Sequence, residues 1–95
     1  MQLKWTKKAL VQFAKLQDYI AQDSPLAAQA VAQRIADATH LLLTQPDLDR
    51  LGRIDGTREW VVKHTPYLLA YRHDGKQLQI LRVIHSKQQW PENLH

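Results

Sequence analysis

Apolar and polar positions alternate with two different periods along the 95 residues. Between Thr6 and Asp23 apolar residues recur every three or four positions, which predicts an amphipathic helix with Thr6 as its N-cap. A second helix should begin at Ser24-Pro25, with serine as N-cap and proline in the first turn, and end before Pro46. The expected buried stripe of the first helix consists of Leu10, Phe13, Leu16 and Ile20. That of the second helix consists of Ala27, Val31, Ile35, Ala38 and Leu42.

From residue 58 onward the period changes to two, which is typical of strands that bury one face. Strands are predicted over residues 58–62, 67–72 and 78–84, and a short one over residues 2–5. The brief break between the two helices predicts an antiparallel helical hairpin. We therefore expect one α+β domain over residues 1–95, with the order strand, helix, helix and three strands, and with the hairpin packed on a small antiparallel sheet.

The sequence Asp74-Gly75 predicts a two-residue type I′ turn, which would fix the register of the last two strands. Leu69 then faces Ile80, and Tyr67 faces Arg82, on the side that meets the helices. The opposite side would be open. It would carry Arg72 and His85, together with an exposed apolar strip formed by Leu68, Leu81 and Val83.

Composition narrows the class of protein. The chain has no cysteine, which excludes disulfides and thiolate metal sites and suits a reducing compartment. We expect a cytoplasmic protein without a signal peptide and without membrane association. The net charge is +4, and residues 50–87 hold eight basic and three acidic residues, so the basic excess lies in the second half. Such a region suits an anionic partner such as nucleic acid or an acidic peptide, although it equally suits a solvated surface.

Candidate chemistry is confined to a few cations and one histidine. The five histidines have no metal-ligand spacing, and no phosphate-loop motif is present, so we expect neither a metal nor a cofactor. RNA cleavage through the 2′-hydroxyl needs a base, an acid and a cation for the phosphorane charge. The residues that could fill these roles are His85, Arg72, Arg82 and Lys87. A lone histidine at a strand end also suits a solvated or capping role, and Arg58 also suits an ion pair.

Three blocks of sequence resemble the ParE-type toxins of the ParE/RelE superfamily. Gly52–Val62 (GRIDGTREWVV) is similar to their G-R-x-x-G-T-R-E stretch followed by apolar residues, and Pro66–Arg72 (PYLLAYR) to their P-Y…Y-R strand. Ile80–Pro91 (ILRVIHSKQQWP) is similar to their closing I-L-R…H…W-P segment. The blocks follow the order of the family, and with the hairpin the resemblance covers nearly the whole chain. It implies the fold expected above.

The resemblance also implies a toxin of a type II toxin–antitoxin system. Its partners would be a cognate antitoxin and a cellular target, and operator DNA would be reached only through the antitoxin. ParE-type members inhibit DNA gyrase by binding it, whereas RelE-type members are ribosome-dependent mRNA endonucleases. A toxin remnant that binds antitoxin and poisons nothing is a third reading.

Departures from the RelE-type pattern favour the binding toxin over the enzyme. Leu68 stands where RelE-type members commonly have arginine, Ser86 follows His85 where many have tyrosine, and Tyr71 is the last tyrosine of the chain. Lys87 keeps a cation near the place of a catalytic arginine. The target-binding candidates are Arg53, Arg58, Arg72 and Trp90. The antitoxin-binding candidates are Leu68, Leu81 and Val83.

Overall fold

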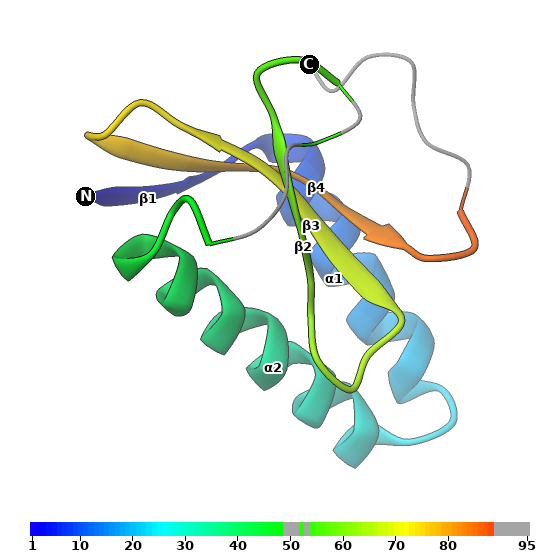
Figure 1. Ribbon diagram of the computed structural model, residues 1–95. Helices are drawn as coiled ribbons and strands as arrows, with labels where there is room; N and C mark the ends of the chain where they lie inside the picture. The colour runs from blue at the N-terminus through cyan, green and yellow to red at the C-terminus, as the bar shows by residue number, and fades with distance from the viewer. Residues whose placement is uncertain (49–51, 53, 89–95) are drawn as a thin grey trace.

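The structure is a computed structural model, and it describes residues 1–48, 52 and 54–88. Its elements, shown in Figure 1, are β1 (Gln2–Trp5), α1 (Lys7–Ala21), α2 (Pro25–Thr44), β2 (Arg58–Val61), β3 (Tyr67–His73) and β4 (Gln77–His85). The two helices run side by side as a hairpin and pack on one face of a four-stranded sheet. This confirms the predicted α+β fold and its order of elements.

Local capping chemistry fixes the ends of the helices as predicted. The Thr6 hydroxyl accepts a hydrogen bond from the Ala9 amide at 3.1 Å, and Pro25 lies in the first turn of α2 behind the Ser24 cap. Helix α2 ends at Thr44, just before Pro46, where a proline ring would clash with the helix. The start and end of each helix are therefore encoded within a few residues.

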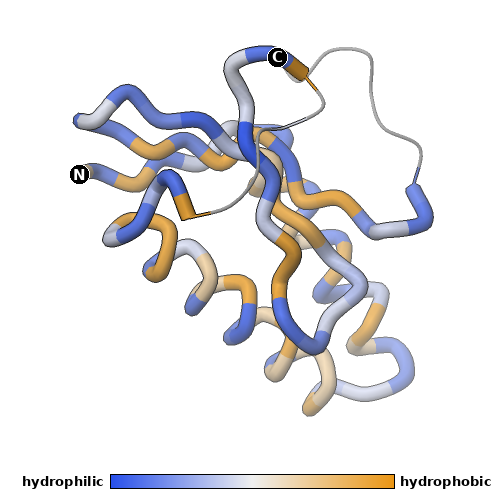
Figure 2. The backbone as a smooth tube through the Cα atoms, in the orientation of Figure 1, coloured by the Kyte–Doolittle hydropathy of each residue, from blue (hydrophilic) through white to orange (hydrophobic). Residues whose placement is uncertain are grey.

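The buried stripes differ from the prediction by one position in each helix. Leu10 is 52% exposed, and Ala9 is buried in its place; Ala27 is exposed, and Ala28 is buried. Figure 2 shows apolar positions recurring along α2 with polar positions between them. Several consecutive apolar residues permit more than one buried stripe.

The sheet has the order β1-β4-β3-β2. Strands β2, β3 and β4 are antiparallel as predicted, and β1 lies parallel to β4, with Leu3 opposite Leu78, so the sheet is mixed. The helical hairpin follows β1 directly, and the ring of Trp5 stacks on Phe13 of α1 with centroids 5.2 Å apart. Strands β1 and β2 form the two edges.

The predicted register of the last hairpin is wrong, for two local reasons. Asp74 Oδ1 accepts from the amides of Lys76 and Gln77 at 2.9 Å each, and the last pair is His73 with Leu78, so four residues lie between the last paired positions instead of two. Aspartate stabilises turns by bonding to its own backbone in this way. A β-bulge then adds Leu81 as an extra residue, since Tyr71 pairs with Ile80 whereas Ala70 pairs with Arg82.

The new register exchanges the faces of the residues that follow the bulge, three of which are candidate site residues. Arg82 points away from the helices, which removes the expected conflict of a charge in the main core. Val83 instead joins the helix-side core. His85 lies opposite Tyr67, and the two rings meet edge to face with centroids 5.3 Å apart, so His85 does not share a face with Arg72.

Two apolar clusters result, one on each face of the sheet. The helix-side core includes Ile35, Leu42, Leu69, Tyr71 and Ile80, all inaccessible to solvent. The outer-face core consists of Leu68, Ala70, Leu81 and Ile84, with Ile54 packed against it. Among the described residues neither helix is long and apolar enough to span a membrane.

Candidate functional site

A polar cluster joins the end of α2 to the sheet. Asp47 Oδ1 lies 3.1 Å from a terminal nitrogen of Arg58 and 2.8 Å from Nε2 of His73. The Tyr71 hydroxyl donates to the Pro46 carbonyl at 3.0 Å and so holds the neighbouring backbone against β3. The hydrogen bond from His73, and then the charge of Arg58, keep the pKa of Asp47 below its ordinary value.

A hydrogen-bonded turn holds the start of β2 in place. The Thr57 carbonyl accepts from the Gly52 amide at 2.7 Å, and the amide and hydroxyl of Thr57 both donate to the Ile54 carbonyl. A Cβ at position 52 would lie about 3 Å from the Thr57 backbone, so the close approach requires glycine. This turn positions Ile54 on the outer-face core and Arg58 beside Asp47.

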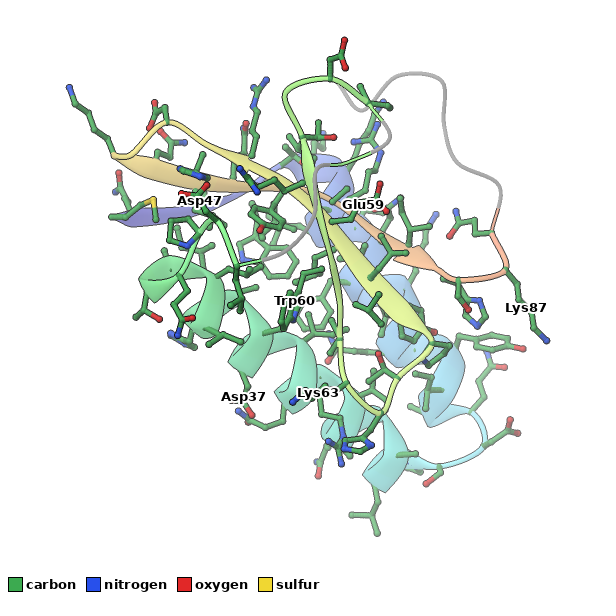
Figure 3. The ribbon with its side chains drawn as sticks, in the orientation of Figure 1. Asp37, Asp47, Glu59, Trp60, Lys63 and Lys87 are labelled. Atoms are coloured by element: carbon green, nitrogen blue, oxygen red, sulfur yellow. The ribbon has the colours of Figure 1, made fainter. Side chains whose placement is uncertain are left out.

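The nuclease candidates do not converge. Arg72 is exposed on the outer face, and its Nε donates to Gln79 at 2.9 Å. His85 lies on the other face, opposite Tyr67. Since Tyr67 and Arg72 are five residues apart on β3, Arg72 and His85 are separated by about 17 Å along the strand direction, at about 3.4 Å per residue. Arg82 is 5% exposed and donates to the Leu81 carbonyl, while Lys87 is exposed beyond the end of β4. Figure 3 shows Lys87 and Asp47 on opposite sides of the molecule.

Two of the target-binding candidates lie together, as neighbours on adjacent strands. Arg58 and Arg72 both line a hollow of about 300 Å³ at one end of the sheet. Its lining residues are Asp47, Gly56, Thr57, Arg58, Arg72 and His73. The other two candidates, Arg53 and Trp90, lie outside the described residues.

The antitoxin-binding candidates are not exposed, which corrects the predicted apolar strip. Leu68, Leu81 and Val83 are 5%, 1% and 4% exposed. Leu68 and Leu81 are covered within the chain, next to Ile54, and Val83 packs in the helix-side core. The period-two pattern placed Leu68 and Leu81 on the outer face correctly, but it misplaced Val83 and did not reveal the turn that covers Leu68 and Leu81.

An open apolar groove lies elsewhere, between α2 and the edge strand β2. It has a volume of about 380 Å³ and is lined by Arg34, Asp37, Ala38, Leu41, Leu48, Trp60, Val62 and Lys63. Figure 3 shows Asp37, Trp60 and Lys63 along this side of the molecule. The sequence did not predict this groove, because its apolar residues come from three separate segments; Trp60 and Leu41 remain partly exposed in it. Among the described residues no group of His, Asp or Glu side chains is placed to hold a metal ion.

Comparison with known proteins identifies the class. Residues 3–90 match the family model described as the ParE toxin of the type II toxin–antitoxin system parDE. The chain is 40% identical over 92 residues to "Putative toxin Y4kP" of Sinorhizobium fredii, covering 97% of this chain and 95% of that protein. It is 38% identical over 85 residues to "Toxin RelE2" of Caulobacter vibrioides, covering 90% and 94% respectively.

A solved structure is similar over most of its length. It is described as the chromosomal ParDE toxin–antitoxin system from P. aeruginosa, with a TM-score of 0.78, 28% identity, and coverage of 90% of this chain and 95% of the other. The fold and these matches define a toxin of a type II toxin–antitoxin system. The chain belongs to the ParE toxin family, and membership implies an antitoxin partner.

Proposed function

We propose that this toxin acts in the cytoplasm by binding and inhibiting DNA gyrase, and that it does not cleave mRNA. The observation that supports this most is the separation of Arg72 and His85, which lie on opposite faces of the sheet. Arg72 of β3 lies beside the start of β4, and His85 lies at the end of β4. A base and a cation acting on one phosphate must both lie within hydrogen-bond reach of it. A binding toxin needs no such convergence.

The contact surface that we propose for gyrase includes the hollow shared by Arg58 and Arg72. Arginine is enriched among the residues that dominate protein interfaces, because its guanidinium combines charge with a planar stacking surface. Asp47 holds Arg58 in a defined position at the rim of this hollow. Arg58 reaches the hollow from the helix side and Arg72 from the outer face, so the two guanidinium groups meet at the end of the sheet.

Two parallel assays on the purified toxin test the proposal. The first follows supercoiling of relaxed plasmid by gyrase, and the second follows cleavage of mRNA on translating ribosomes. We expect inhibition of supercoiling and intact mRNA. Cleaved mRNA together with full gyrase activity would establish the alternative, a ribosome-dependent endonuclease.

We further propose that the antitoxin occupies the groove between α2 and β2. Strand β2 is an edge, so its outer backbone groups can pair with an extended segment, as in recognition by β-strand addition. Apolar side chains of such a segment would meet Leu41, Leu48 and Trp60, and acidic ones would meet Arg34 or Lys63.

The test is the affinity of the antitoxin for a Leu48→Asp variant. Leu48 is 41% exposed in the groove, so the variant should fold, and the buried charge should weaken the complex at least about tenfold. Leu26→Asp is the control, since Leu26 is 78% exposed at the start of α2 and does not line the groove. Equal affinity of Leu48→Asp and the parent chain would place the antitoxin elsewhere.

A further inference from the structure

The groove between α2 and the edge strand β2 has an apolar end and a charged end. The apolar end, with Leu41 and Leu48, lies where α2 ends, and Asp47 contacts Arg58 there at the start of β2. Since α2 ends beside the start of β2, its earlier turns lie toward the end of that strand. Figure 3 shows Trp60 between Asp47 and the far end of the groove. The two ends therefore lie beside different parts of the same strand.

The charged end is formed by three side chains from the two walls of the groove. Arg34 and Asp37 lie one turn apart on α2, and Lys63 follows β2 on the opposite wall (Figure 3). Asp37 Oδ1 accepts from Gln33 Nε2 at 2.8 Å. Within the part of the chain that the structure describes, the side chains of Arg34 and Lys63 form no hydrogen bond or ion pair. With two positive charges and one negative charge, this end is positive overall.

The backbone of β2 determines which side chains of an added strand enter the groove. The Val62 amide donates to the Tyr67 carbonyl at 3.0 Å, toward β3. Successive residues of an antiparallel pair alternate in the direction of their backbone groups, so Val61 directs its amide and carbonyl toward the open edge. The side chains of Trp60 and Val62 both lie on the helix side. An added strand would therefore place in the groove the two side chains that lie opposite Trp60 and Val62.

These two positions of an added strand have different surroundings. The residue opposite Trp60 lies nearer the apolar end, and the residue opposite Val62 lies at the charged end, next to Lys63. An apolar side chain is stabilised by burial at the first position, and a carboxylate is stabilised by the two cations at the second. The apolar end suits many sequences, whereas the charged end disfavours a segment that brings a cation there. The charges therefore discriminate between segments.

From this geometry we infer that the antitoxin segment runs antiparallel to β2 and carries an acidic residue two positions before an apolar one. Strands β2, β3 and β4 are already antiparallel, and parallel pairing is slightly less stable per residue. In an antiparallel segment the residue opposite Val62 precedes the residue opposite Trp60 by two positions. The inference rests on the proposed placement of the antitoxin in this groove, and it adds the direction, the residue order and the role of Arg34 and Lys63 in specificity.

Paramagnetic relaxation in the complex of the full-length toxin with isotope-labelled antitoxin tests the direction. Because the toxin has no cysteine, Ala30→Cys and Gln45→Cys can each carry a single spin label. Both positions are exposed and outside the groove lining, and they are about 22 Å apart at about 1.5 Å per helical residue. The label at position 30 should broaden mainly amides around the acidic residue, and the label at position 45 mainly amides after the apolar one. The opposite order along the antitoxin would overturn the inferred direction.

Charge reversal tests the residue order. The Arg34→Glu/Lys63→Glu variant should bind antitoxin at least about tenfold more weakly at low salt, because it places like charges together. Replacing the acidic residue of the antitoxin by lysine should restore most of this affinity. The control is Lys15→Glu/Lys76→Glu, which reverses the same number of charges at exposed positions outside the groove. It should change the affinity by less than about threefold, and circular dichroism should show both variants folded.

The outcomes separate this inference from the placement on which it rests. Equal weakening by both double variants, or no recovery with the lysine-substituted antitoxin, would overturn the inferred residue order. If Leu48→Asp weakens the complex and Arg34→Glu/Lys63→Glu does not, the antitoxin occupies the groove but the charged end does not read it. If Leu48→Asp leaves the affinity unchanged, the placement fails, and the inference fails with it.

Discussion

The two faces of the sheet are built on different principles. The helix-side face has an apolar centre that α1 and α2 cover, and its polar residues, Arg58, His73 and His85, lie near the strand ends. The outer face has a small apolar core, covered in part by the turn around Ile54, and it also buries two charged residues, Glu59 and Arg82. In the sheet register Glu59 pairs with Ala70, and Ala70 pairs with Arg82, so the three form one row across the strands.

The difference is between packing of apolar groups and positioning of charges. Burial of large apolar side chains is non-directional and tolerates an approximate pattern, which suits the face that maintains the fold. Buried charges are costly unless their positions are exact, and a fold retains them where position matters. Of the two arginines that share a hollow, Arg72 projects from the outer face, whereas Arg58 projects from the helix side beside Asp47.

The largest expected effect comes from breaking the helix-side face. Ile35 is completely buried in the middle of α2, so Ile35→Ala removes buried methyl groups and leaves a cavity. We expect a loss of about 2–5 kcal/mol in the free energy of unfolding, measured by urea denaturation. Ala30→Gly, at an exposed position of the same helix, controls for backbone propensity and should cost about 1 kcal/mol. If Ile35→Ala lowers the free energy of unfolding by less than the control does, α2 does not pack on this face of the sheet.

A smaller effect is expected from overfilling the outer face. Ala70 is completely buried between Glu59 and Arg82 in the row across the strands, so Ala70→Leu would displace both charged side chains. We expect a loss of about 1–3 kcal/mol from overpacking. Val61→Leu, a smaller enlargement at a half-exposed position of β2, is the control and should be nearly neutral. If Ala70→Leu is equally neutral, the outer face is not tightly packed.

The smallest effect concerns Asp47, whose carboxylate is solvent-exposed. Its pKa is lowered by the hydrogen bond from His73 and by Arg58, so folding favours the ionised form. The stability that it contributes is present above pH 3.8, its ordinary pKa, and is lost as the pH falls through the lower folded value. The urea midpoints of the parent chain and Asp47→Asn should therefore differ at neutral pH and converge in acid. A difference that persists in strong acid would contradict this, and added salt should reduce it at neutral pH.

The sequence predicted the helix-side face better than the outer face, and particular residues show why. Thr6, Ser24 and Pro25 act within one turn of where they stand, so the helix ends were correct. The segment Ile80–Ile84 is buried on both faces, so its pattern carries no period that reveals the bulge at Leu81. The contact between Asp47 and His73 joins residues 26 apart and leaves no local signature.

The family resemblance predicted the class of protein correctly, but it did not predict which residues are exposed at its sites. The motif residues Arg58 and Arg72 do share a hollow, whereas Leu68, Leu81 and Val83 are buried rather than presented to an antitoxin. Thr6 was predicted only as a helix cap. Its second hydrogen bond, from the hydroxyl to the Leu81 carbonyl at the bulge, is seen only in the folded chain.

Inhibition of gyrase supercoiling by His85→Ala and Arg58→Ala variants tests the central claim most directly. If His85 were the general acid or base of a nuclease, its loss would lower the rate typically by about 10²–10⁴-fold. In a gyrase-binding toxin His85, packed on Tyr67 away from Arg58, should contribute little to binding. We predict that folded His85→Ala inhibits gyrase supercoiling with a potency within about threefold of that of the parent toxin, and that Arg58→Ala is at least about tenfold less potent. A folded His85→Ala that has lost its toxicity in cells without antitoxin, alongside an Arg58→Ala that still kills, would contradict it and favour the ribosomal nuclease.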